Sequence, residues 1–268
     1  MLLSVFHSTT YNYAELVSRS TQYIRLSPFP SVAQKIKHWR VDLPVPGLLM
    51  NDAFDNPTRL LTLNRPHDAI QILAQGEVEV SDVEEGEPAG RLDPRIFLRS
   101  TSLTEIDGPL LDFIEPMRNL VRQRPLVGVT DLMHAVLDAM PYTKDVTEVS
   151  FNAGQSFAAK AGVCQDHAHV YTTCCRAMGV PARYVSGYVY TPELAEVASH
   201  AWAEVWLANR WLSFDISNAR NAGGTHLKLA IGLDYNDACP VRGVRVGGGE
   251  EKLTSLTRVT QHQSANQQ

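Results

Sequence analysis

The stretch that decides the fold reads Gly162-Val163-Cys164-Gln165-Asp166-His167-Ala168-His169-Val170-Tyr171-Thr172-Thr173-Cys174-Cys175-Arg176-Ala177-Met178-Gly179-Val180-Pro181. Its apolar residues recur at helical spacing, and the stripe consists of Ala168, Tyr171, Cys174, Cys175 and Met178. Gly179 and Pro181 follow as a signal that ends a helix. The pattern predicts a buried helix that begins at Cys164, with Cys174 and Cys175 as packing residues.

A cysteine at the first turn of a helix is placed for nucleophilic chemistry. The reactive form is the thiolate, which the unpaired N–H groups and the dipole of a helix start stabilise. Gly162 should permit a close backbone approach, so that a substrate carbonyl reaches Cys164 and its N–H donates to a developing oxyanion. Cys164 is therefore the candidate nucleophile of acyl transfer. A buried structural thiol is the alternative, since free cysteine is among the most buried residue types.

Two strand patterns downstream, at residues 200–207 and 211–216, carry the candidate base and its partner. A two-residue loop at Ala208-Asn209 puts Asp215 diagonal to His200 on one face of the hairpin, where the two side chains can hydrogen-bond. A three-residue loop puts Asp215 on the opposite face unless a bulge restores the register. The sequence alone does not decide between the two loop lengths.

On the first geometry, Cys164, His200 and Asp215 form a catalytic triad. Cys164 attacks, His200 takes and returns the proton, and Asp215 holds the imidazole tautomer and stabilises its charged form. The alternatives are a strand histidine in an ordinary polar contact and a carboxylate at a turn.

No metal and no organic cofactor is expected. His167 and His169 lie close to Cys164 in sequence, but residues two apart point to different sides of a helix, so we interpret them as core or surface histidines. None of the four cysteines has a partner at zinc-knuckle spacing, and four are too few for a disulfide scaffold in a chain of 268 residues.

The first third of the chain has the pattern of an antiparallel β module. Its strand-like runs, separated by Pro, Gly, Asn and Asp, are residues 5–13, 21–26, 35–41, 58–63 and 69–80. Residues 81–90 are acidic and turn-rich, which is typical of an exposed connection. Beyond it, helical spacing appears after Asp107-Gly108-Pro109, at residues 130–140 and near residues 155–160. We therefore predict an N-terminal module at 1–95, a core with C-terminal strands at 96–260 and a disordered tail at 261–268.

Composition excludes several classes of protein. Hydrophobic residues make up 44% and charged residues 20%, as in folded globular proteins. The net charge is −5 and no basic run is present, so nucleic acid is not an expected partner. The sequence contains no stretch of about 18 to 20 apolar residues, which is the length that a membrane-crossing helix needs. Because the start, residues 1–7, lacks a basic region and a full apolar region, we expect a cytoplasmic protein. Nothing in the sequence indicates an oligomeric state.

Four stretches together resemble a known family. They are residues 162–169, Met178-Gly179-Val180-Pro181-Ala182-Arg183-Tyr184-Val185-Ser186-Gly187-Tyr188, Ser199-His200-Ala201-Trp202-Ala203-Glu204-Val205 and Trp211-Leu212-Ser213-Phe214-Asp215. In this order they resemble the core of the bacterial transglutaminase-like superfamily, whose members are often described as cysteine proteases. The resemblance implies an α+β, papain-like core, in which a helix bearing Cys164 packs on an antiparallel sheet bearing His200 and Asp215. Residues 7–13 and 25–28 resemble the β module that precedes this core. Residues 234–235, 240–243 and 247–249 resemble its C-terminal strands.

The sequence departs from the family pattern at two places. Asp215 is followed by Ile216-Ser217-Asn218 where Pro-Thr-Asn is expected, and His167 stands where Phe is common. The expected function is thiol-dependent acyl transfer on an amide of a peptide, a protein or a peptide-like substrate. Water as acceptor gives a protease or amidase, and an amine gives transglutaminase chemistry; the sequence leaves both open. The alternatives are a catalytically inactive binding module of the same fold and a metal-dependent hydrolase with Cys and His ligands.

Overall fold

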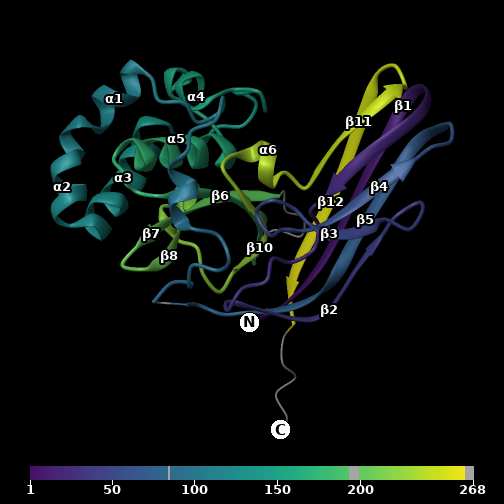
Figure 1. Ribbon diagram of the computed structural model, residues 1–268, viewed down its shortest axis with the longest axis horizontal. Coiled ribbons are helices and arrows are strands. Elements are labelled where there is room, and N and C mark those ends of the chain that lie inside the picture. Colours follow the sequence, from purple (N-terminus) through teal and green to yellow (C-terminus); the bar gives the residue numbers. More distant parts are fainter. Residues whose placement is uncertain (84, 193–198, 263–268) are drawn as a thin grey trace, which may run out of the picture.

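The first strand, β1 (Leu2–Ile24), is the centre of a seven-stranded antiparallel sheet (Figure 1). The computed structural model describes residues 1–83, 85–192 and 199–262. The N-terminal half of β1 lies between β5 (His67–Val80) and β12 (Glu251–Gln261), and its C-terminal half between β4 (Pro57–Leu63) and β11 (Val241–Gly247). β2 (Gln34–Asp42) pairs with β5, and β3 (Leu48–Asn51) pairs with β4. Leu3, Val5, His7 and Thr9 are buried in alternation, which gives the sheet one inward face.

The C-terminal strands belong to this sheet and not to the core. The prediction assigned residues up to 260 to the core, whereas β11 and β12 pair along most of β1. The turn between them is Gly247, Gly248 and Gly249, all with positive φ, a conformation that glycine adopts without steric cost. The predicted strand 5–13 and residues 21–24 of the predicted strand 21–26 are parts of the single strand β1. Of the tail predicted to be disordered, Gln261 ends β12, and residues 263–268 lie outside the described residues.

The second sheet carries the helices on one side (Figure 1). Its order is β10-β6-β7-β8-β9, with bounds β6 (Ala182–Val189), β7 (His200–Leu207), β8 (Arg210–Asp215), β9 (Arg220–Asn221) and β10 (His226–Gly232). The helices are α1 (Gly108–Ile114), α2 (Arg118–Gln123), α3 (Pro125–Ala139), α4 (Ala153–Ala159), α5 (Cys164–Ala177) and the short α6 (Tyr235–Ala238). Single 3₁₀ turns occupy Pro94–Leu98, Glu115–Met117 and Ile216–Asn218. The predicted α+β fold is confirmed.

Helix α5 is the buried centre of this second unit. It packs on β6 and β7, and its residues from Asp166 to Arg176 are all buried. Tyr171, Cys174 and Cys175 belong to the same hydrophobic cluster as residues of α3 and β8, which confirms the packing role predicted for the two cysteines. Gly179 ends the helix region with φ +81°, as its stop signal predicted.

The two sheets share one hydrophobic cluster, and a chain of charges ties the connection between them to the second sheet. Tyr188, Leu227 and Leu229 of the second sheet pack among the inward residues of the first. The connection at residues 81–90, expected to be merely exposed, is anchored at Glu87, whose carboxylate lies 3.0 Å from Lys228 Nζ. Lys228 also contacts Glu204, which binds Arg183. Among the described residues, no helix is long and apolar enough to cross a membrane.

Candidate active site

Cys164 is the first residue of α5, as predicted, and it is the one cysteine of the four that is not buried. The helix start is fixed by Asp166, whose carboxylate accepts hydrogen bonds from Val163 N at 2.8 Å, Ser156 Oγ at 2.7 Å and Thr147 Oγ1 at 2.7 Å. The sulfur therefore sits on a rigid element that is anchored from three sides.

The structure gives Gly162 a packing role, and the predicted approach of a substrate beside it stays a prediction. A Cβ atom at this glycine would lie 2.8 Å from Cβ of Asp166, closer than real contacts allow. Gly162 is thus required because Asp166 packs against it inside the protein. The side chain of Asp166 fills the space into which a side chain at position 162 would project.

The hairpin of β7 and β8 has the register that brings the base and its partner to one face. Leu207 pairs with Arg210, which leaves the two-residue loop Ala208-Asn209. Both loop residues have positive φ, +49° and +62°, the backbone conformation of a type I′ turn. The two-residue loop is confirmed, and the alternative loop of three residues is excluded.

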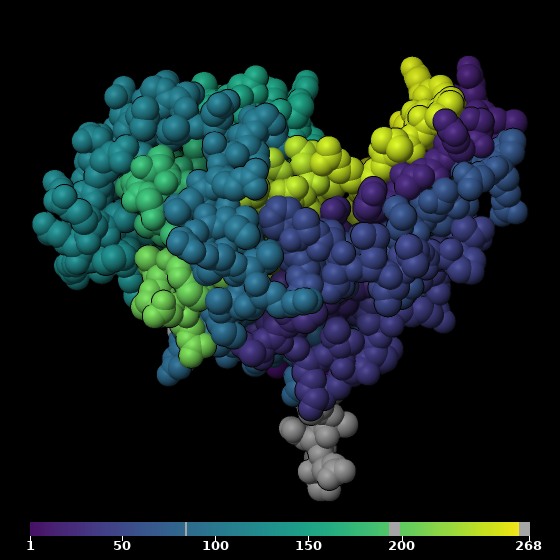
Figure 2. All heavy atoms as spheres, viewed as in Figure 1, coloured from purple at the N-terminus to yellow at the C-terminus, as the bar shows by residue number. Residues whose placement is uncertain are grey.

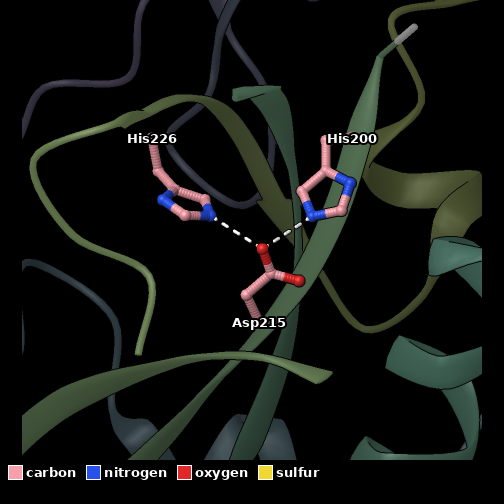
Figure 3. Close-up of side chains that lie close together, drawn as sticks. All are labelled: His200, Asp215 and His226. Atoms are coloured by element: carbon pink, nitrogen blue, oxygen red, sulfur yellow. Dashed lines mark hydrogen bonds and ion pairs between the residues drawn. The ribbon is translucent and has the colours of Figure 1, made fainter. Parts of the chain in front are cut away.

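His200 and Asp215 meet across this hairpin (Figure 3). His200 Nε2 lies 3.0 Å from Asp215 Oδ2 as an ion pair, without the alignment of a regular hydrogen bond. The Asp215 side chain is fully buried, and Asn218 Nδ2 donates to its Oδ2 at 2.6 Å. The His200 ring also contacts the Cys164 thiol. Because Nε2 faces Asp215, Nδ1 is the ring nitrogen left to exchange a proton with the sulfur.

The electrostatics of the pair favour charge on both partners. Burial alone would lower the pKa of His200, but its contacts with Asp215 and with Cys164 outweigh burial and raise the pKa to about 10. Burial likewise opposes ionisation of Asp215, yet the histidines beside it hold the pKa of this carboxyl well below its usual range. The arrangement thus holds an imidazolium next to the thiol of Cys164.

A second histidine at this site was not predicted. His226, the first residue of β10, places its Nε2 2.9 Å from the same Oδ2 of Asp215 (Figure 3). Its neighbours are His200, with ring centroids 6.0 Å apart, and Trp202, with centroids 5.2 Å apart. The sequence signal was weak, because a single histidine before the apolar run of β10 does not reveal which strand or loop lies beside it.

Ligand-type atoms of His200, Asp215 and His226 lie within 4.8 Å of one another, a spacing that metal ions also accept. Here the nitrogens are directed at the carboxylate, which serves as their common partner. His167 is engaged by protein groups at both ring nitrogens, Ser217 Oγ at 2.8 Å and the Met140 carbonyl at 2.7 Å. The expectation of a catalytic site without metal stays a prediction.

Two aromatic side chains lie near Cys164, and α6, which bears one of them, borders a hollow of the molecule (Figure 2). Tyr142 is near the thiol and 46% exposed, and Tyr235 of α6 packs against the same small cluster of buried residues as Cys164. Figure 2 shows a notch between the helix-covered part of the molecule and the projecting part of the first sheet, where β11 turns into β12 beside the middle of β1, and α6 lies at its base. Helix α6, whose Tyr235 packs against the same cluster as Cys164, thus lies at the base of this notch (Figure 2).

A cysteine-bearing helix packed on an antiparallel sheet that bears His and Asp defines the class of transglutaminase-like, papain-like folds. Two family models match the chain: that of the transglutaminase-like superfamily at residues 120–216, and that of the bacterial transglutaminase-like N-terminal region at residues 3–79. Together they span well over half of the chain, which belongs to the transglutaminase-like superfamily.

Relatives of similar length accompany these matches. An uncharacterized protein of Mycobacterium bovis is 27% identical over 285 residues, covering 94% of this chain and 90% of its own. One of Mycobacterium leprae is 26% identical over 280 residues, covering 96% and 98%. The crystal structure of a protein from Cytophaga hutchinsonii, described as a putative cysteine protease, superposes with a TM-score of 0.72 at 17% identity. It covers all of this chain and 92% of its own, a likeness of fold alone.

Proposed function

We propose that this protein catalyses thiol-dependent acyl transfer on amide bonds of peptides, proteins or peptide-like substrates, through Cys164, His200 and Asp215. The observation that carries the proposal is the placement of a fully buried carboxylate 3.0 Å from a histidine that contacts the thiol at the start of α5. Such a constellation is the general arrangement of an activated nucleophile, its base and an orienting group.

The reaction proceeds in two halves. The Cys164 thiolate attacks the amide carbonyl, and the first N–H groups of α5, which have no partner within the helix, stabilise the oxyanion. The His200 imidazolium then gives its proton to the departing amine as the carbon–nitrogen bond breaks, which leaves a thioester on Cys164. Water or a second amine attacks the thioester and gives its proton to His200, and the Cys164 thiolate leaves as the carbon–sulfur bond breaks, which restores the starting pair of thiolate and imidazolium.

Asp215 holds the ring of His200 throughout this cycle. Its contact with Nε2 directs Nδ1 toward the sulfur and stabilises the charged ring that both halves require. Substrate approaches over the exposed Tyr142 and along the notch beside α6 (Figure 2), where an extended chain can lie against the aromatic surface. Water exclusion at this surface decides between hydrolysis and transfer to an amine.

Trapping of the acyl-enzyme tests the proposal. The protein is incubated with glutamine-containing peptide pools, quenched in acid, and mapped by peptide mass spectrometry for an acyl adduct on Cys164. Hydroxylamine should release the adduct as a hydroxamate, and an added primary amine should appear in the product if the acceptor is an amine. Cys164→Ala is the control, and adducts on the three buried cysteines mark unfolded protein.

Acyl adducts confined to Cys164 would support the proposal. Equal turnover by wild type and Cys164→Ala on a substrate of this protein would refute it. Absence of adducts from every amide, combined with an unreactive thiol, would instead favour the inactive binding module of the same fold.

A further inference from the structure

We propose that His226 is a positioning residue that acts on His200 through Asp215, as a neutral hydrogen-bond donor whose tautomer is fixed by the loop before β10. This inference rests on the proposed function, and it assigns a role to a residue that does not touch the thiol. Its basis is the shared carboxylate oxygen of Asp215, on which both histidines converge.

The two histidines contact the carboxylate differently. His226 Nε2 makes a 2.9 Å hydrogen bond to Asp215 Oδ2, whereas His200 Nε2 lies at 3.0 Å with poorer alignment. The side chain of His226 is 4% exposed and that of Asp215 is fully buried, so solvent does not compete for this bond. His226 therefore anchors the oxygen that His200 faces.

The tautomer of His226 follows from its other nitrogen. Gly223 N donates to His226 Nδ1 at 3.3 Å, so Nδ1 accepts and carries no proton. The hydrogen must then lie on Nε2, the nitrogen that faces Asp215. Thr225 Oγ1 lies 3.2 Å from Nδ1 and can donate to it as well. The loop at residues 223–225 thus decides that Nε2, and not Nδ1, is the ring nitrogen of His226 that donates.

The charges that face His226 come from several elements. They are Asp215 of β8, His200 of β7 and Arg220 of β9, whose guanidinium lies 4.0 Å from Asp215 Oδ2. Burial lowers the pKa of His226 despite its bond to Asp215, so the ring stays neutral while His200 is charged. By donating a hydrogen bond while it stays neutral, His226 makes the Asp215 carboxylate a weaker base and leaves His200 as the protonated ring beside it. The proton shared between His200 and Asp215 then stays on His200.

The role predicts how two matched variants behave. His226→Phe keeps a ring of similar size but removes the donor, whereas His226→Gln can return an amide N–H near the position of Nε2. The probe is the rate of iodoacetamide alkylation of Cys164 at pH 6, located by peptide mass spectrometry. We expect His226→Phe to slow alkylation about tenfold, the scale of one hydrogen bond to a charged group, and His226→Gln to recover most of the rate.

A double-mutant cycle separates this role from a structural one. In an Asp215→Ala background, His226→Phe should change the rate less than about twofold, because the group through which it acts is gone. An undiminished tenfold effect there, or wild-type alkylation by His226→Phe, would overturn the inference.

The tautomer gives a readout that needs neither turnover nor a variant. In ¹⁵N-histidine-labelled wild type at pH 7, His226 should appear as the neutral Nε2–H form by long-range proton–nitrogen NMR. A charged ring or the Nδ1–H form would refute the inference. If wild-type Cys164 proves to be an ordinary thiol while this tautomer is found, the proposed function fails and the bond between His226 and Asp215 remains.

Discussion

Replacing Asp215 by Asn tests the electrostatic core of the site with little change of shape. The pKa of His200 is about 10 in the native protein, because its contacts with Asp215 and Cys164 outweigh burial. An amide at position 215 removes the charge while burial persists, so the pKa of His200 should fall toward or below its ordinary 6.5.

The size of the effect follows from this shift. At pH 7.5 a histidine of pKa 6.5 is only about one tenth protonated, whereas one of pKa 10 is almost fully charged. Loss of one hydrogen bond to a charged group costs about 1.5–3 kcal/mol, or roughly tenfold to 100-fold in rate. Because these effects overlap, we expect Asp215→Asn to lower turnover at pH 7.5 about 100-fold, with measurable activity left.

The assay is a titration of His200 by proton–nitrogen NMR in labelled wild type and variant, paired with rate measurements from pH 5 to pH 10. The charged ring is present below its pKa and lost above it, so the basic limb of activity should move from near pH 10 to near pH 6.5. An unchanged titration of His200 in Asp215→Asn, or an unchanged basic limb, would refute the reasoning.

Three further outcomes are expected. Gly162→Ala should destabilise the protein by about 1–3 kcal/mol in urea unfolding, because its Cβ would meet Asp166 at 2.8 Å; a neutral substitution would contradict this contact. Glu204→Gln should cost about 3–5 kcal/mol at pH 7, since it leaves Arg183 and Lys228 buried beside an uncharged group. Burial opposes charge on Glu204, but these two cations lower its pKa from 4.5 to about 2. The stabilisation that the charged Glu204 contributes is therefore present above pH 4.5 and lost as pH falls toward 2. The free energies of unfolding of wild type and variant should converge near pH 2, and a difference that stays constant with pH would argue against these ion pairs. A chelator should leave turnover unchanged while thiol alkylation abolishes it, and the reverse pattern would favour a metal-dependent hydrolase.

Features set by local sequence were predictable. Gly179 and Pro181 end the helix of Cys164, and helical spacing does begin after Asp107-Gly108-Pro109, where Asp107 caps α1 by accepting a hydrogen bond from Leu110 N. The face shared by His200 and Asp215 depended on loop length alone, and the sequence offered two alternatives. Positive φ at both loop residues decides between them, and that is a property of the folded hairpin.

Features set by distant pairing were not predictable. β12 joins β1 across more than 230 residues, and no local pattern states which strand is its partner. β3 was missed because its four residues are mostly exposed and have no clear alternation. His226 reaches Asp215 only because the chain returns from β9 to the start of β10, so its role emerges from the fold and not from its neighbours in sequence.

The pH dependence of iodoacetamide alkylation of Cys164, with His200→Ala as control, shows whether His200 activates the thiol. The account predicts selective modification of Cys164 well below pH 8 in wild type and loss of this reactivity in the control, because the His200 imidazolium stabilises the thiolate. Slow alkylation of wild type with the profile of an ordinary thiol, the same with and without His200, would contradict the account.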